Sequence, residues 1–319
     1  MLGKGISLQT SVERFALKRC IGCGDGSVFL GSCFADSIGE RFADYGLASL
    51  SNPLGTLYNP ASIREVILPL SDISSAALPL FEREGEWRCW LAGTQVAAPT
   101  EEECRGLIVS SLERLREQLC RARHLFVTLG TSVCYRLRQS GLTVCNCHKA
   151  AASLFEEHRL SVDECVAALS DIVRNVTALN PDIEVVFTVS PFRYQKYGFH
   201  GSQLSKATLL LSLEEVGRLF PERCSYLPVY ELFMDELRDY RFYASDMLHP
   251  SPLAVDIVWN RLVEECMTPP LQRYLEEYEP IRRALAHRPL NPDTPEYQSF
   301  LSDTERKRAA LVARYQTET

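Results

Sequence analysis

The sequence has no long Lys/Arg-rich run, and its formal net charge is −7. Proteins that bind nucleic acid without sequence preference need a basic face, so this composition argues against a nucleic-acid partner. No window approaches 18 uninterrupted apolar residues, which excludes an evident membrane span. Residues 1–17 lack the apolar core and small-residue cleavage site of a signal peptide. We therefore expect a cytoplasmic protein.

Disulfides and metals are not needed for folding, because a chain of 319 residues can bury a sizeable apolar core. Its twelve cysteines are expected to be free thiols in the reducing cytoplasm. Cys20 and Cys23, together with Cys145, Cys147 and His148, could furnish zinc ligands, but the second group lacks the usual spacing. The prediction is therefore no metal and no other cofactor.

Short β-rich runs alternate with amphipathic segments along the chain. Buried strands are expected at 27–30, 125–129, 185–189 and 226–230, and helices at 33–42, 101–123, 161–180, 206–219 and 252–267. Ser161 and Glu164 form a capping box for the third of these helices. Such alternation predicts an α/β fold with a mostly parallel sheet covered on both faces. Ligands of such sheets bind beyond the carboxyl ends of the strands.

We expect one domain over 1–285, in which 56–100 is an excursion or insertion, followed by a peripheral polar helical tail over 286–319. The excursion contains several prolines and two tryptophans, and the tail is polar. No internal repeat and no low-complexity segment interrupts this arrangement.

The first predicted strand ends in Gly31-Ser32-Cys33, and a helix follows at once. A nucleophile at a strand-to-helix turn is exposed and lies at the positive end of the helix. This position predicts that the Cys33 thiol has a lowered pKa and is reactive. The alternative is that Cys33 is a small core residue and that Ser32 is the helix N-cap.

Near the other end lies Asp246-Met247-Leu248-His249-Pro250. An acid three residues before a histidine can hold the Nδ1–H of the imidazole and leave Nε2 free as a base. Alternatively, the histidine caps a loop beside a solvated aspartate. The charged run 235–241 that precedes the motif is expected to brace this loop by internal ion pairs.

Taken together, Gly31-Ser32-Cys33-Phe34-Ala35 and the distal Asp246…His249 resemble the GSCFA family, within the SGNH or GDSL-type hydrolases. Further matches to the family extend over nearly the whole chain: 52–60, 128–131, 146–149, 190–193, 205–206 and 235–243. The resemblance implies a three-layer α/β/α sandwich with a doubly wound sheet, and ester or acyl-transfer chemistry. The superfamily places its nucleophile third in a Gly-Asp-Ser triplet, and Cys33 holds that place here, with Ser32 as the second candidate.

The resemblance also implies an oxyanion hole. Gly55 resembles the glycine that follows the second strand of the superfamily. Gly130-Thr131-Ser132-Val133 occupies the place of the Gly-x-Asn-Asp block but has no Asn or Asp, so Ser132 or Asn146 is left as the second donor. His148 and Lys149 could line the pocket or could be structural.

Two functions are compatible with these residues. The first is a hydrolase or acyltransferase for an acyl ester, with a carbohydrate or cell-envelope precursor among the candidate substrates. In it Cys33 attacks, His249 relays the proton and Asp246 orients His249. The second is a catalytically weak SGNH-like module that binds a carbohydrate or acyl group, which the missing Gly-x-Asn-Asp block favours.

Overall fold

A central sheet of five parallel strands organises the protein. The computed structural model describes residues 10–291 and 293–316, and the strand order is β11-β10-β6-β1-β2. The strands are β1 (Gly26–Gly31), β2 (Ser49–Ser51), β6 (Ala122–Leu129), β10 (Glu184–Val189) and β11 (Cys224–Tyr226). All four pairings between neighbours are parallel. The predicted α/β class and parallel sheet are confirmed.

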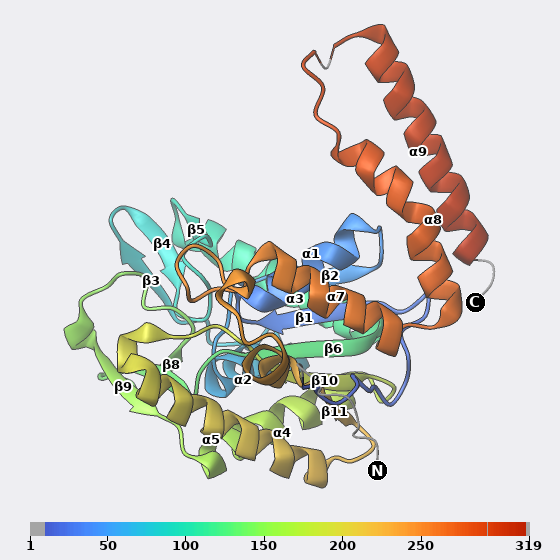
Figure 1. Cartoon of the computed structure of the whole chain (residues 1–319). Coiled ribbons are helices and arrows are strands. Elements are labelled where there is room, and N and C mark those ends of the chain that lie inside the picture. The colour runs from blue at the N-terminus through green and yellow to red at the C-terminus, as the bar shows by residue number, and fades with distance from the viewer. Residues whose placement is uncertain (1–9, 292, 317–319) are drawn as a thin grey trace, which may run out of the picture.

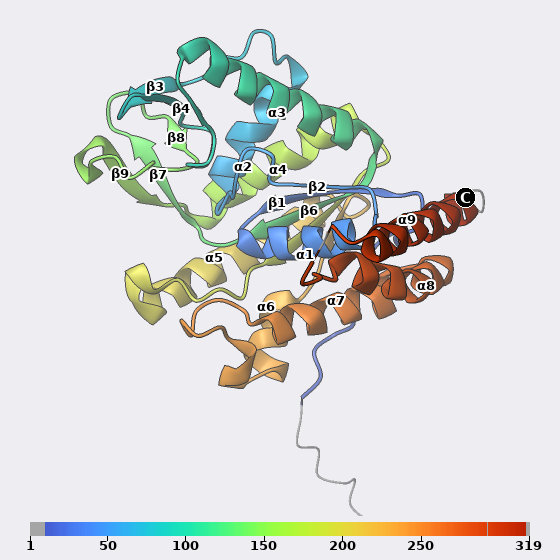
Figure 2. The ribbon, with the colours of Figure 1, turned by 90° about the horizontal axis from the view of Figure 1, so that it is seen from above.

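The two faces of the sheet bury different apolar clusters. Alternate residues of β1, β6 and β10, such as Leu30, Val127 and Val185, contribute to one cluster. It is closed by α2 (Pro60–Ile67), α3 (Glu101–Arg121), α4 (Val162–Leu179) and α5 (Gly198–Leu219). Phe29 and Phe126 contribute to the other cluster, which is closed by α1 (Cys33–Asp44), α7 (Pro252–Cys266) and α8 (Pro269–Ala286). Figure 2 shows α2, α3 and α4 on one side of β1 and β6, with α1 and α7 on the other. The sheet is therefore buried by helices, as its continuous apolar runs predict.

The helices that flank the sheet begin at a capping side chain in α2, α3, α4 and α7 but not in α1 and α5. They are α1 (Cys33–Asp44), α2 (Pro60–Ile67), α3 (Glu101–Arg121), α4 (Val162–Leu179), α5 (Gly198–Leu219) and α7 (Pro252–Cys266). The Ser161–Glu164 capping box of α4 is present in both directions. Thr100 and Ser251 cap α3 and α7 with one bond each, because their side chains accept the N–H groups of Glu103 and Ala254. The predicted helices that correspond to α1, α3, α4 and α7 are confirmed, whereas α2 was not predicted.

Two predicted elements were wrong in extent. The strand predicted at 226–230 ends at Tyr226, and α6 (Val229–Glu231) follows Pro228. Proline has no N–H for the ladder, so the strand cannot continue through it. The helix predicted at 206–219 begins at Gly198. Its first turns bury small polar residues such as Ser202 and Ser205, so the apolar periodicity is absent there.

Two small antiparallel sheets cover the side of the molecule toward which the central strands point (Figure 1). The excursion over 56–100 contains α2 and the sheet β3 (Leu80–Arg83), β4 (Glu86–Cys89) and β5 (Ala97–Ala98). The second sheet, of β7 (Val133–Leu137), β8 (Thr143–Val144) and β9 (Phe155–Arg159), was not predicted. Its strands are short and only partly buried, so the apolar pattern that marks a strand is weak.

The chain ends in a helical hairpin of α8 (Pro269–Ala286) and α9 (Pro295–Gln316). Figure 1 shows α9 running back along α8, with both extending away from the sheet. Leu311 and Tyr315 of α9 are buried in the contact, and the Tyr315 hydroxyl donates to Glu277. No helix within residues 10–291 and 293–316 combines the length and apolar character that spanning a bilayer requires.

Candidate active site

A cavity of about 350 Å³ opens at the carboxyl ends of β1 and β6. The chain leaves β1 toward the face covered by α1 and leaves β6 toward the face covered by α4. This divergence is the position where open α/β sheets bind ligands. The cavity is lined by Ser32, Cys33, Tyr58, Asn59, Gly130, Thr131, Val133, Tyr135, Val144, Cys145, Asn146, Cys147, Phe192, Tyr194, Tyr197 and His249.

The turn after β1 is held in one conformation by Gly31. Its φ is +137°, and an added Cβ would lie 2.2 Å from the Thr128 carbonyl oxygen, so only glycine fits. The Gly31 N–H donates to Asn52 Oδ1 at 2.9 Å, and Asn52 Nδ2 donates to Asp36 at 2.8 Å. The Ser32 N–H donates to Thr128 O at 3.0 Å. The two side chains that follow Gly31 are thereby fixed relative to the sheet.

Ser32 and Cys33 differ in accessibility. Ser32 is 2% exposed, and its Oγ has no hydrogen-bond partner among the described residues. Although Ser32 occupies the N-cap position of α1, its side chain makes no capping bond, so the predicted cap is wrong. Cys33 is partly exposed. Of the two candidate nucleophiles, Cys33 is the one that a substrate in the cavity reaches more easily.

The pKa of the Cys33 thiol is raised, which is the opposite of the prediction. Burial is the largest cause, and the nearby Asp36 carboxylate acts in the same direction. The N–H groups of Cys33 and Phe34 at the helix N-terminus, and Lys206, lower the pKa but do not compensate. Desolvation therefore outweighs the helix terminus here. The resting group is a thiol that needs a base.

His249, which also lines the cavity, is held by Asp246. The His249 Nδ1 lies 2.5 Å from Asp246 Oδ2. The other carboxylate oxygen accepts the N–H groups of Leu248 and His249, each at 2.9 Å. These hydrogen bonds lower the pKa of Asp246 to about 2. The carboxylate thus stays ionised, and it fixes the imidazole through Nδ1.

The remaining nitrogen of His249 is available for chemistry. Nε2 has no hydrogen-bond partner in the part of the chain that the structure describes, and the ring lines the cavity. The ring packs on Phe192 with 4.4 Å between ring centres. The side chains of His249 and Asp246 remain 47% and 45% exposed. The pair is therefore accessible to solvent, in contrast to the buried turn at Ser32.

The loop that carries His249 is closed by local backbone bonds. The Ala244 N–H donates to His249 O at 2.7 Å, and the Arg193 N–H donates to Leu248 O at 3.1 Å. Met247 has a φ of +59°, which is uncommon for a residue with a side chain. The loop is thus anchored both to itself and to the segment that follows β10.

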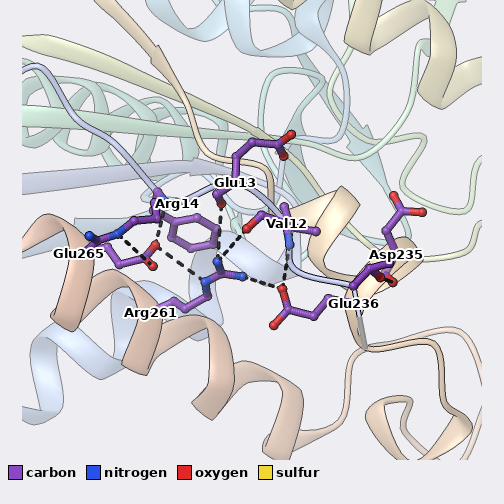
Figure 3. Close-up of polar contacts among 9 residues, drawn as sticks. Val12, Glu13, Arg14, Asp235, Glu236, Arg261 and Glu265 are labelled. Atoms are coloured by element: carbon purple, nitrogen blue, oxygen red, sulfur yellow. Dashed lines mark hydrogen bonds and ion pairs between the residues drawn. The ribbon is translucent and has the colours of Figure 1, made fainter. Parts of the chain in front are cut away.

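Residues 235–241, which precede this loop, are held mainly by contacts with the N-terminal segment of the chain and with α7 (Figure 3). Glu236 accepts the Val12 N–H at 3.0 Å and pairs with Arg261 of α7 at 3.0 Å. Arg261 also donates to Val12 O, and Glu265 accepts the Phe15 N–H. Within the charged run itself, the pairs Asp235–Arg238 and Asp239–Arg241 are more exposed. Bracing therefore comes chiefly from Glu236 and distant residues.

Four predicted binding residues lie away from the cavity lining. The Gly55 N–H already donates to Asn52 O at 2.8 Å, so Gly55 does not offer the predicted oxyanion donor. Both the N–H and the hydroxyl of Ser132 donate to Ser205. The His148 ring is buried and makes T-shaped contacts with the stacked rings of Phe81 and Trp90, and its Nε2 lies 3.0 Å from Cys89 O. Lys149 is exposed on the surface.

Gly130 and Asn146 do border the cavity. The N–H groups of Gly130 and Thr131 both donate to Tyr58 O, at 2.8 and 2.9 Å, so neither is free for an oxyanion. Asn146 Oδ1 accepts the His148 N–H at 2.7 Å, which orients the side-chain amide. Asn146 Nδ2 has no protein partner within residues 10–291 and 293–316. It is therefore the better placed of the two side-chain donors considered.

Sequence reasoning missed the aromatic wall and a buried lysine. Five rings line the cavity: Tyr58, Tyr135, Phe192, Tyr194 and Tyr197. Three of them follow the end of β10, a position that could have indicated them, whereas Tyr135 lies on an unpredicted strand. Lys206 of α5 is fully buried behind Gly130.

Within the described residues, no group of three or more His, Cys, Asp or Glu side chains is arranged to hold a metal ion. Cys20, Cys145 and Cys147 are free thiols.

Comparison with known proteins identifies the family. The GSCFA family profile matches residues 27–262, which include both walls of the cavity. The profile described as the C-terminal domain of GSCFA domain proteins matches residues 278–317, the region of the helical hairpin. No curated protein matches the chain. Because the first match covers more than half of the sequence, this chain belongs to the GSCFA family.

Proposed function

We propose that the protein is a hydrolase or acyltransferase of the SGNH type that acts on an acyl ester. The observation that carries this proposal is that His249, which is held by Asp246, lines the same cavity as Cys33, although the two motifs lie at opposite ends of the matched region. The parallel sheet between two apolar clusters is compatible with the three-layer α/β/α sandwich of that superfamily.

In the proposed mechanism Cys33 Sγ attacks the ester carbonyl. His249 Nε2 takes the thiol proton as the S–C bond forms and then donates it to the leaving alcohol, which yields a thioester. Asp246 orients the imidazole and stabilises its charged form. Water hydrolyses the thioester, or a second alcohol takes the acyl group. The raised pKa of Cys33 makes the base necessary, because little thiolate exists at rest.

The oxyanion that forms on the carbonyl needs donors that are not already used. The Cys33 N–H at the start of α1 is one, since helix N-termini carry unpaired N–H groups. Asn146 Nδ2 is the second, in place of Gly55 and Ser132. A single such donor is commonly worth about a hundredfold or more in rate.

The lining favours an uncharged substrate. It contains five aromatic rings and no Asp, Glu, Lys or Arg side chain. A cavity of about 350 Å³ is at the small end for ligand pockets. Esters of a carbohydrate or of a neutral cell-envelope precursor fit this description, because sugar rings stack on aromatic side chains. The free thiols suit a reducing compartment, and we propose the cytoplasm.

A second function is favoured by a different observation. The thiol pKa is raised, and the backbone N–H groups of Gly55 and Gly130 are already paired. A protein with those properties would bind an acyl or carbohydrate group with little turnover.

Turnover of short-chain p-nitrophenyl esters by purified protein separates the two. For the enzyme we expect measurable hydrolysis that is lost when iodoacetamide modifies Cys33, and lost in Cys33→Ala. Cys120→Ala is the matched control, because Cys120 is an exposed thiol at the other end of β6. Saturable binding of an ester without hydrolysis would support the binding module. Turnover that survives in Cys33→Ala would remove the thiol mechanism.

A further inference from the structure

A buried cation lies directly behind the cavity. Lys206 of α5 has no exposed surface, and its Nζ donates to Gly130 O at 2.7 Å and to Ser190 O at 2.6 Å. These carbonyls belong to the turns that follow β6 and β10, and Gly130 lines the cavity together with Cys33. Burying an ammonium is costly unless a counter-charge accompanies it. Among the described residues no carboxylate pairs with Lys206.

The neighbours of Lys206 come from three other elements. Cys33 approaches from α1 and Arg193 from the segment after β10. The Tyr230 ring of α6 has its centre 5.8 Å from Nζ. Burial lowers the pKa of Lys206 to about 7, Arg193 acts in the same direction, and Cys33 opposes it. In return, Lys206 lowers the pKa of the Cys33 thiol, while Asp36 of α1 raises it.

We propose that Lys206 is a positioning residue that supplies the counter-charge of the Cys33 thiolate while it holds the turns after β6 and β10. The inference rests on the proposed role of Cys33 as nucleophile. Two N–H groups of Lys206 donate to the carbonyls of Gly130 and Ser190, and a neutral amine is sufficient for these two hydrogen bonds. The additional proton places a positive charge behind Gly130, which lines the cavity together with Cys33. In molecules in which Lys206 is protonated, it keeps its proton when His249 removes the thiol proton, and no bond to Lys206 forms.

Alkylation of Cys33 tests this without any substrate. The rates at which iodoacetamide modifies Cys33 and Cys147 are measured by peptide mass spectrometry between about pH 6 and pH 9, where thiolates form. Cys147 is the internal reference, since it lines the same cavity and is also partly buried. Lys206→Met removes the charge and the donors, whereas Lys206→Gln removes the charge and retains an N–H₂ group.

In both variants we expect alkylation of Cys33 at neutral pH to slow by roughly tenfold, as loss of a nearby charge in a partly buried site implies. Cys147 should change by less than about twofold. Lys196→Met is the matched control, because Lys196 lowers the pKa of Cys147 and has no such effect on Cys33. Lys196→Met should slow the alkylation of Cys147 and leave the alkylation rate of Cys33 unchanged. An unchanged Cys33 rate in both variants, or slowing in Lys206→Met alone, overturns the role of the charge.

The wild-type protein gives a readout that does not depend on the folding of a variant. Near pH 7, where Lys206 loses its proton, the logarithm of the Cys33 rate should rise less steeply with pH than a single-proton titration. A single-proton curve like that of Cys147 overturns the proposal. Ester turnover is scored separately: if no ester reacts but Cys33 behaves as expected, the proposed function fails and the role of Lys206 stands.

Discussion

The two walls that carry the proposed reacting groups are built in opposite ways. The turn at Gly31 lies within the sheet and is held by bonds to Thr128 and Asn52, and Ser32 beside it is almost fully buried. The loop at His249 lies outside the sheet, and the side chains of His249 and Asp246 are about half exposed. One wall is therefore inseparable from the fold, whereas the other can change with little cost to stability.

The largest effect is expected from Gly31→Ala, which introduces a side chain into the rigid turn after β1. The new Cβ would meet backbone at 2.2 Å in a conformation disfavoured for alanine, so we expect a loss of at least about 3 kcal/mol or failure to fold. Urea unfolding of the purified protein measures the loss. Gly106→Ala in α3 is the control, because nothing lies near its Cβ position, and it should stabilise by about 0.5–1 kcal/mol. A variant as stable as wild type would show that the turn tolerates a side chain.

His249→Ala removes the imidazole from the exposed loop of the site. Ester turnover should fall by about 10²–10⁴, the range for general acid–base catalysis. The free energy of unfolding should change by less than about 0.5 kcal/mol, because the side chain is half exposed. Both are measured on the same preparation, with His200→Ala, an exposed histidine on α5, as control. Turnover within about tenfold of wild type would remove His249 from the mechanism.

The pH dependence of Asp246 sharpens the comparison. Its pKa is depressed to about 2, so its stabilising contacts are complete above the unfolded value of about 3.9 and are lost as the pH falls toward 2. Carbon-detected NMR of the carboxyl group should give a midpoint near pH 2. In His249→Ala the midpoint should move up, because the imidazole hydrogen bond is one of its causes, but the backbone N–H groups remain. A midpoint that does not move would mean that the pair is not formed in solution.

The smallest effect is expected from Ser32→Ala. The Oγ is buried and lacks a partner among the described residues, so its removal should change stability by no more than about 0.5 kcal/mol. Ser161→Ala, which breaks a complete capping box, should cost about 1 kcal/mol and serves as the comparison. Thermal unfolding ranks the two. Ester turnover should persist in Ser32→Ala, and its complete loss would make Ser32 the nucleophile.

Much of the central layer could be predicted because its signals are local. Largely apolar runs mark β6 and β10, and caps such as Ser161 mark some of the helix starts. Both depend on residues within a few positions of each other. The small sheet β7–β9 could not be predicted, since its residues are only partly buried and the pairing of β7 with β9 spans a long connection.

The same division holds for the site. The order of residues placed Cys33 at the end of a strand and Asp246 within reach of His249, because a strand-to-helix turn and a three-residue spacing are local properties. The thiol pKa depends on burial and on Asp36 and Lys206, and the availability of Gly55, Ser132 and Asn146 depends on partners elsewhere in the chain. Desolvation and hydrogen-bond partners are set by atoms distant in sequence, so they appear only once the chain is folded.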